Sequence, residues 1–197
     1  MQAITTTTLS ATRSMSRQRM LALAKQKGVT LTELIVSVVV MVLIVGFVFF
    51  MKGQVYGPLL GWMEATAVST QMGKIENVYS GSANYTGLTT ASMATASIFQ
   101  SKYLPGANVI NNRFGGQVTL GIVTINTTSD TMSYTDGGIR SDSCPTLVNQ
   151  LAEDADRITV AGTVVKPVNG ILNAATLKTQ CDSATTVAVM FERIKRS

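Results

Sequence analysis

The chain has 197 residues, with 16 basic side chains, 11 acidic side chains and no histidine. Its first 28 residues hold five of the basic side chains and no acidic one, so the other 169 residues are neutral overall and predict no basic face for nucleic acid. The absence of histidine excludes Ser-His-Asp and Cys-His catalysis and most zinc sites, and two cysteines 37 positions apart exclude a close redox pair. Enzymes that act through Lys, Asp or Glu are not excluded by composition, but no recognisable group of such residues occurs, so we expect no enzyme and no cofactor.

The first element predicted along the chain is a membrane-spanning helix. Residues 34–51 (LIVSVVVMVLIVGFVFFM) are 18 uncharged residues, which as a helix cover about 27 Å of the roughly 30 Å hydrocarbon core of a bilayer. Because five basic residues precede this run, we expect the N-terminus to stay in the cytoplasm and the rest to cross the membrane. A cleaved secretory signal is the alternative, but its apolar region is usually about 7–15 residues long and is followed by an A-x-A-like site, which is absent here.

A short motif stands just before the apolar run. Residues 27–33 are KGVTLTE, with a glycine at the end of the basic stretch and a carboxylate, Glu33, five residues later. The simplest explanation is that Glu33 marks the cytoplasmic boundary, because a charge at the centre of a membrane helix costs about 2.5–3.5 kcal/mol. The whole pattern, however, resembles the class III signal of type IV prepilins. The 28-residue leader, and Val29 in place of the usual Phe, resemble the type IVb branch.

The resemblance implies how the N-terminus is processed. A membrane aspartic protease, the prepilin peptidase, would cut between Gly28 and Val29 on the cytoplasmic side. The leader, residues 1–28, would be removed and Val29 would become a methylated first residue. Cleavage frees an amine, and helices packed side by side would leave a carboxylate without water. We therefore expect Glu33 to pair with the Val29 amine of an adjacent subunit in a filament.

The membrane run is predicted to be the first half of a long helix over residues 29–80. Between residues 52 and 61, three glycines and a proline disfavour helix and predict a kink at Gly57 and Pro58. In pilins the corresponding stretch can unwind in the filament, so a kink and an unwinding segment both stay open. From Trp62 to Tyr79 helical periodicity resumes, with Glu64 among the polar residues that fall largely outside the apolar stripe. The stripe consists of Ala65, Val68, Met72, Ile75 and Tyr79.

Residues 81–197 are predicted to form a head of α+β class, with a mainly antiparallel sheet packed on the long helix. A turn is expected at residues 112–116, and a hairpin is expected to join the first two strands. The expected helices are Thr89–Lys102, Ser143–Asp154 and Ala174–Gln180, and the expected strands are Gln117–Ile125, Thr131–Thr135, Arg157–Lys166 and Thr185–Glu192.

Cys144 and Cys181 lie beyond the membrane in this topology, where an oxidising periplasm favours a disulfide. Type IVb pilins close their C-terminal region with one such bridge, so the resemblance implies the same pairing; two unpaired buried cysteines are the alternative. No metal is expected, because the acidic residues 142, 153, 154 and 156 lack the spacing of a calcium-binding loop.

The function that the resemblance implies is structural. The chain would be the major pilin of a type IVb pilus, stored in the inner membrane with its head in the periplasm. An assembly ATPase and a platform protein would polymerise it, and the filament would leave through an outer-membrane secretin to serve adhesion, aggregation or conjugative transfer. A minor pilin or a type II secretion pseudopilin is the first alternative. An unprocessed, single-pass periplasmic binding protein is the alternative of another class.

Overall fold

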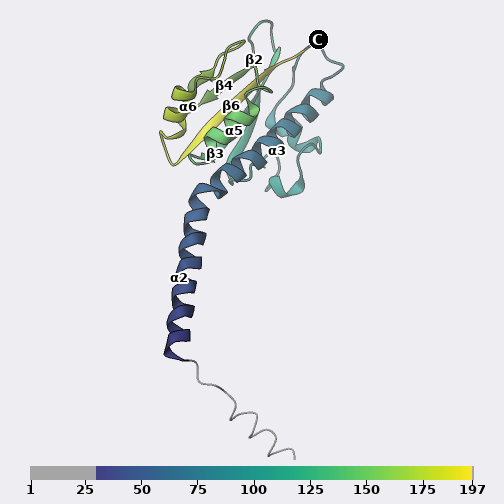
Figure 1. The fold of residues 1–197 in the computed structure, drawn as a ribbon. Coiled ribbons are helices and arrows are strands. Elements are labelled where there is room, and N and C mark those ends of the chain that lie inside the picture. The colour runs from purple at the N-terminus through teal and green to yellow at the C-terminus, as the bar shows by residue number, and fades with distance from the viewer. Residues whose placement is uncertain (1–29, 197) are drawn as a thin grey trace, which may run out of the picture. The chain divides into compact units, whose positions relative to one another are not determined.

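The computed structural model describes residues 30–196 (Figure 1). The chain divides into two compact units between Phe49 and Phe50. The predicted leader, residues 1–28, and the predicted first mature residue, Val29, lie outside the described residues.

Helix α2, Leu31–Gln54, contains the whole predicted apolar run. Its stretch from Leu31 to Met51 is the one helix within residues 30–196 that is long and apolar enough to cross a membrane, and none of it is buried. Valine, leucine, isoleucine and phenylalanine occupy positions all around the helix, so it has no single apolar stripe of the kind that a core helix shows. Length and composition therefore support the predicted membrane span.

One residue, Val55, separates α2 from helix α3, Tyr56–Val78. Pro58 has no N–H to donate to the carbonyl of Gln54 four residues earlier, which accounts for the end of α2 at Gln54. Gly57 and Pro58 lie in the first turn of α3, so the interruption comes two residues before the predicted kink. The kink itself stays a prediction.

Helix α3 packs against the head through one face. Tyr79 follows the helix and is half-buried against the core. The expectation that Glu64 lies outside this face was wrong: its side chain is buried, because Arg113 from a distant turn of the chain binds it. The rest of the predicted stripe is confirmed as buried, namely Ala65, Val68, Met72 and Ile75.

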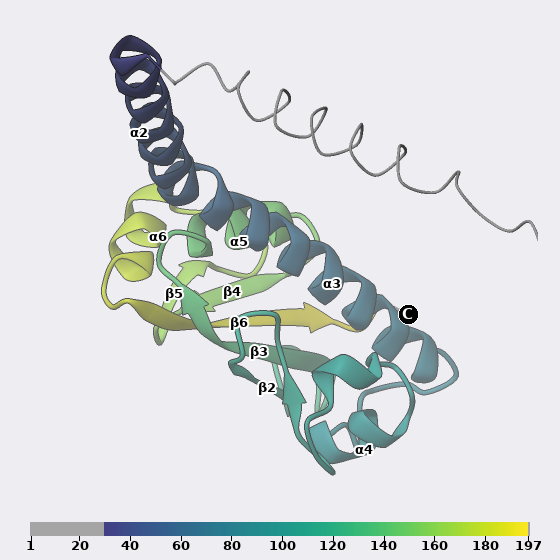
Figure 2. The same cartoon turned by 90° about the horizontal axis from the view of Figure 1, so that it is seen from below.

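The head is built on a six-stranded antiparallel sheet with the order β1-β2-β3-β6-β4-β5 (Figure 2). The last strand in sequence, β6, pairs with both β3 and β4, so the C-terminal segment joins the two halves of the sheet. The strands are β1 (Ile110–Asn111), β2 (Gln117–Val123), β3 (Thr131–Arg140), β4 (Arg157–Val160), β5 (Thr163–Lys166) and β6 (Thr186–Ile194).

The segment Arg157–Lys166 is a hairpin and not the single strand that the sequence predicted. Ala161 and Gly162 have φ angles of 49° and 81° and reverse the chain between β4 and β5. Two consecutive residues with positive φ are what a tight two-residue hairpin turn requires. Gly162 was the one local signal for this turn, because alanine does not favour the positive φ that Ala161 adopts, and strand-forming residues stand on both sides.

Strand β3 is longer than predicted. It was expected to end at Thr135, where the sequence Asp-Gly-Gly favours a turn, but it continues to Arg140. An irregularity in its pairing with β6 lies between Asp136 and Ile139, and Gly138 has a φ of 68° there. The two glycines therefore form a β-bulge within the strand instead of ending it.

Three short α-helices were predicted in the head and three are present among the described residues, but not all of them have the predicted length. The helix expected over Thr89–Lys102 stops early, because Ser97 adopts a φ of 55° that a right-handed helix does not allow. The short two-residue strand β1 was not predicted. The helices are α4 (Thr90–Thr95), a 3₁₀ turn η1 (Ser101–Tyr103), α5 (Cys144–Leu151) and α6 (Ala174–Cys181).

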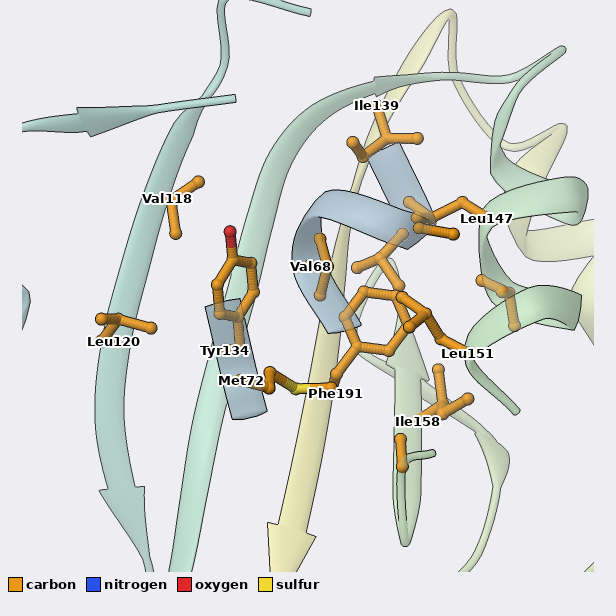
Figure 3. Packing of buried hydrophobic residues seen from close by; sticks show 14 of the residues in the cluster. Val68, Met72, Val118, Leu120, Tyr134, Ile139, Leu147, Leu151, Ile158 and Phe191 are labelled. Carbon is orange, nitrogen blue, oxygen red and sulfur yellow. The ribbon is translucent and has the colours of Figure 1, made fainter. Parts of the chain in front are cut away.

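A single apolar core joins α3, α5 and the sheet (Figure 3). Met72 from α3, Leu151 from α5 and Phe191 from β6 are each at most 1 % exposed and converge at its centre. Tyr134 of β3 is also buried, and its hydroxyl donates to Gln71 Oε1 at 2.5 Å. The predicted α+β class with a mainly antiparallel sheet is therefore confirmed, and the helix α3 packs on the sheet as expected.

Candidate functional site

The first turn of α2 holds the one charged residue of the candidate membrane span, Glu33. Its Oε2 accepts hydrogen bonds from Thr30 N at 3.0 Å and Thr30 Oγ1 at 3.1 Å, and Glu33 N donates to Thr30 Oγ1 at 3.4 Å. This is a reciprocal capping box, which satisfies N–H groups that the helix start leaves without partners. Within residues 30–196, both bonds to the carboxylate use Oε2, and none of these residues donates to Oε1.

The capping box was not anticipated from the sequence. Thr30 and Glu33 stand three residues apart in the T-x-x-E order that marks such a helix start, just before the apolar run. This T-x-x-E order was a signal for the capping box that the prediction did not use. Glu33 therefore has a local role in starting α2, whatever further partner it binds.

Gly57 and Gly61 place the start of α3 in close contact with the chain just before α5. A Cβ added to Gly61 would lie 2.5 Å from the carbonyl oxygen of Ser143, and one added to Gly57 would lie 2.6 Å from Asp142 Cγ. Two glycines four residues apart face the same side of a helix and let backbones approach closely. These glycines thus have a packing role, which the prediction of a kink had not considered.

The two cysteines form a disulfide, as predicted. Cys144 begins α5 and Cys181 ends α6, and their Cα atoms lie 5.7 Å apart. Both residues are fully buried. The bridge therefore joins the two helices that flank the β4–β5 hairpin and fixes the C-terminal part of the head.

Two carboxylates are buried, one in α3 and one in β3. Glu64 accepts from the backbone N–H of Arg113 at 3.3 Å and lies 3.6 Å from that residue's Nε. Asp136 is fully buried; its Oδ1 accepts from Asn112 Nδ2 at 2.7 Å, while its Oδ2 has no partner. Burial raises the pKa of Glu64, and burial together with the nearby Glu64 charge raises the pKa of Asp136 well above its usual range.

A third carboxylate, Asp130, organises the loop between β2 and β3. Its oxygens accept from the backbone N–H groups of Ile125, Asn126 and Thr127 at 2.8–3.0 Å, and from the hydroxyl of Thr131 at 2.9 Å. Burial alone would raise the pKa of Asp130, but these donors outweigh it and hold the pKa well below its usual range. Asp130 is thus a structural anchor of the hairpin.

Residues 30–196 contain no group of three or more side chains placed to hold a metal ion. Three of the four acidic residues considered from the sequence have other partners: Asp142 pairs with Arg140, and Asp156 lies 3.8 Å from Arg196. Asp154 accepts from the hydroxyl of Ser69 at 2.7 Å. Each of these carboxylates therefore acts in local packing.

Comparison with known protein families identifies a family that matches this chain. The family model described as PilS N terminal matches residues 62–192. The chain belongs to the PilS family. A match of this length covers most of the head and its strands except the last two residues of β6, so the predicted recognition of a type IVb pilin is confirmed.

Solved pilin structures are similar to this chain, and the first of them shares its fold. A crystal structure of a type IV b pilin from Salmonella typhi matches with a TM-score of 0.52 at 15% identity, covering 66% of this pilin and 96% of that chain. TcpA, a type IV pilin from Vibrio cholerae El Tor biotype, matches with a TM-score of 0.47 at 15% identity over 66% of this chain and 99% of that one. The NMR structure of the type IVb pilin PilS from Salmonella typhi gives 0.46 at 16% identity over 68% and 96%. No curated protein matches the chain significantly in sequence.

Membership of a pilin family has direct consequences. Pilins are structural proteins and not enzymes, and they assemble with other pilin subunits into filaments. Helix α2, the one candidate membrane span within residues 30–196, fits a pilin that is first anchored in a membrane and later becomes extracellular.

Proposed function

We propose that this chain is the structural subunit, the major pilin, of a type IVb pilus. It is stored in the inner membrane through α2 with its head in the periplasm, and is then polymerised into a surface filament. The observation that carries the proposal is α2 itself: from Leu31 to Met51 it exposes apolar side chains on every side, with one carboxylate near its start. Lipid can cover such a surface before assembly, and other copies of the same helix can cover it afterwards.

The N-terminus of the subunit is produced by cleavage between Gly28 and Val29 by a prepilin peptidase, and Val29 is then methylated. The KGVTLTE motif supports this step. The start of α2 supports it as well, because Leu31 begins the helix two residues after the proposed cut, so that almost the whole mature N-terminus is helical.

Glu33 has two partners in the filament. Thr30 holds its Oε2 within the same chain, and Oε1 accepts the Val29 ammonium of an adjacent copy. An α-amino group normally has a pKa of about 7.7–8.0, so the freed amine is largely charged at neutral pH. An unpaired carboxylate among packed apolar helices would cost several kcal/mol, and this ion pair offsets that cost in one axial register only.

Assembly requires other proteins to act on this chain. We assign it a prepilin peptidase, an assembly ATPase, a platform protein in the inner membrane and an outer-membrane secretin. The filament then serves adhesion, aggregation or conjugative transfer through its heads. A low-copy minor pilin or a secretion pseudopilin would share the same α2 and signal, and abundance separates these alternatives from a major pilin.

The proposal is tested by comparing surface filaments from cells that carry the wild-type chain, Glu33→Val or Ser37→Val. Ser37 is the matched control, because it is a polar residue one turn further along α2 whose hydroxyl bonds only to Leu34 O. We expect abundant filaments with the wild type and with Ser37→Val, and a strong loss with Glu33→Val. Equal filament yields from Glu33→Val and the wild type would contradict the role of Glu33. If the chain occurs only in traces in filaments made mainly of another subunit, it is a minor pilin and not the major pilin.

A further inference from the structure

Most charges on the head are paired within the chain. The described residues contain six ion pairs, all of them in the head. Lys166 and Lys195 are half-buried and donate to backbone carbonyls. Asp130 and Asp136 are buried. The ion pairs are Glu64–Arg113, Glu76–Arg193, Asp142–Arg140, Asp156–Arg196, Asp182–Lys178 and Glu192–Arg157.

Four further charges without an ion-pair partner remain among the described side chains of residues 55–196. Two are the cations Lys74 and Lys102, which are both exposed, and Lys74 Nζ also donates to the carbonyl oxygen of Ile98 at 3.3 Å. Two are the anions Glu153, which is exposed, and Asp154, which is half-buried. The two cations and the two anions lie in two separate places.

The positive pair lies in a groove on one side of α3. This groove has a volume of about 220 Å³ and is lined by Gln71 and Lys74 of α3 and by Lys102, Tyr103 and Arg113 of the segment that follows. Lys102 Nζ lies 4.8 Å from the centre of the Tyr103 ring. Because Arg113 is offset by Glu64, the two lysines set the net charge of the groove.

The negative pair lies on the other side of α3, at the end of α5. A groove of about 240 Å³ is lined there by Ser69 of α3 and by Gln150, Leu151 and Asp154. The hydroxyl of Ser69 donates to Asp154 Oδ2 at 2.7 Å and holds that carboxylate in place. Glu153 is its exposed neighbour in sequence.

A single exposed ridge of α3 separates the two grooves. Thr66 and Thr70 border both of them, and Ser69 and Gln71 project on either side of Thr70 because successive helix positions are about 100° apart. In Figure 1, α5 and the teal segment after α3 lie on the two sides of α3. One subunit therefore presents charges of opposite sign on the two flanks of one helix.

We propose that the acidic groove of one copy docks against the basic groove of the next, so that Glu153 and Asp154 pair with Lys74 and Lys102 across the contact. The partner is a second copy of this chain, because the charges at the two grooves are opposite in sign. Two different patches on the same subunit make a heterologous contact, which repeats from copy to copy and generates an open helical polymer. Charge complementarity of this kind sets orientation and register more than affinity. The inference rests on the proposed filament and adds the head surfaces that hold it.

The test is a charge reversal with rescue, made in the full chain in cells. We expect Lys74→Glu with Lys102→Glu to lower the yield of sheared filaments at least roughly tenfold, the effect of about 1.4 kcal/mol per contact. Glu153→Lys with Asp154→Lys should do the same, because each variant places like charges opposite one another. Combining all four changes should restore most of the yield. The control is Lys178→Glu combined with Asp182→Lys. It exchanges the charges of an exposed ion pair in and just after α6, so that neither charge loses its partner.

A second measurement uses unaltered filaments, so that it does not depend on the variants folding. Carbodiimide joins carboxylates to amines in direct contact, and we expect covalent dimers whose junction peptides join residue 153 or 154 to residue 74 or 102. Normal filament yield from both charge-reversed variants, or no such junction in dimers from wild-type filaments, would overturn the docking. Absence of any filament from the wild-type chain would instead refute the filament function, which distinguishes the two failures.

Discussion

Gly61 of α3 lies so close to Ser143 that a Cβ at position 61 would stand 2.5 Å from the Ser143 carbonyl oxygen. Thr146 Cβ and the Leu147 amide would also lie within 3.3 Å of it. The obstacle is mainly backbone, so it cannot swing aside as a flexible side chain could. This contact seats α3 on the start of α5, next to the buried disulfide.

Replacing Gly61 by Ala should therefore destabilise the head. Gly→Ala within a helix normally gains about 1 kcal/mol, but forcing a methyl group into a packed contact costs about 1–3 kcal/mol. We expect a net loss of up to about 2 kcal/mol in the free energy of unfolding, measured by denaturant titration in detergent. Gly73→Ala, in the same helix with open space around it, is the control and should be neutral or stabilising. If the two variants are equally stable, the close contact does not exist in solution.

Loss of the disulfide should have a larger effect. The bridge between Cys144 and Cys181 closes a loop with a sequence separation of 37, for which the chain-entropy model gives about 4 kcal/mol. Reductant should lower the unfolding midpoint of the wild-type chain and leave that of the double variant Cys144→Ala, Cys181→Ala unchanged. A wild-type midpoint that does not respond to full reduction would contradict a stabilising bridge.

Asp130 should stabilise the head in a pH-dependent way. Asp130→Asn removes the charge that three backbone N–H groups bind, so we expect a loss of about 2–3 kcal/mol at pH 7. The folded pKa lies below the usual value, so the stabilisation is present above the unfolded pKa of about 3.9 and disappears as pH falls below it. The difference between variant and wild type should therefore shrink in acid. Asp182→Asn, at an exposed ion pair, should change stability by less than about 1 kcal/mol.

Asp136 should have the opposite pH dependence. Its pKa is raised in the folded head, so above the unfolded pKa the unfolded chain releases this proton first and stability falls as pH rises. Asp136→Asn removes this ionisation, so its stability should decline less between acid and alkaline pH than that of the wild type. Chemical unfolding at several pH values measures the difference. Parallel pH curves for the two proteins would show that Asp136 is not a neutral buried acid.

Patterns that lie within one stretch of sequence predicted the structure well. The uncharged run predicted α2, and the spacing of apolar residues from Ala65 to Ile75 predicted the buried face of α3. The oxidising compartment implied by the membrane segment predicted the disulfide. Each of these depends on residues close in sequence or on one clear chemical rule. The same holds for the α+β class, which follows from the order of the elements.

Features that depend on distant partners could not be predicted in this way. Glu64 is buried because Arg113, 49 residues later, binds it. The two flanking grooves bring residues near position 70 together with residues 102 and 154, which no local pattern reveals. The extension of β3 depends on its pairing with β6, which carries the strand past two glycines. Tertiary pairing overrode the local turn signal there.

The most direct test of the whole account is the N-terminal residue of the chain recovered from sheared surface filaments. Mass spectrometry of the intact subunit and of its N-terminal peptide identifies that residue without any substitution. The account predicts a methylated Val29 and a mass that corresponds to residues 29–197 with one disulfide. A chain from the surface that still carries residues 1–28 would contradict it, because Glu33 would then have no amine from Val29 to bind.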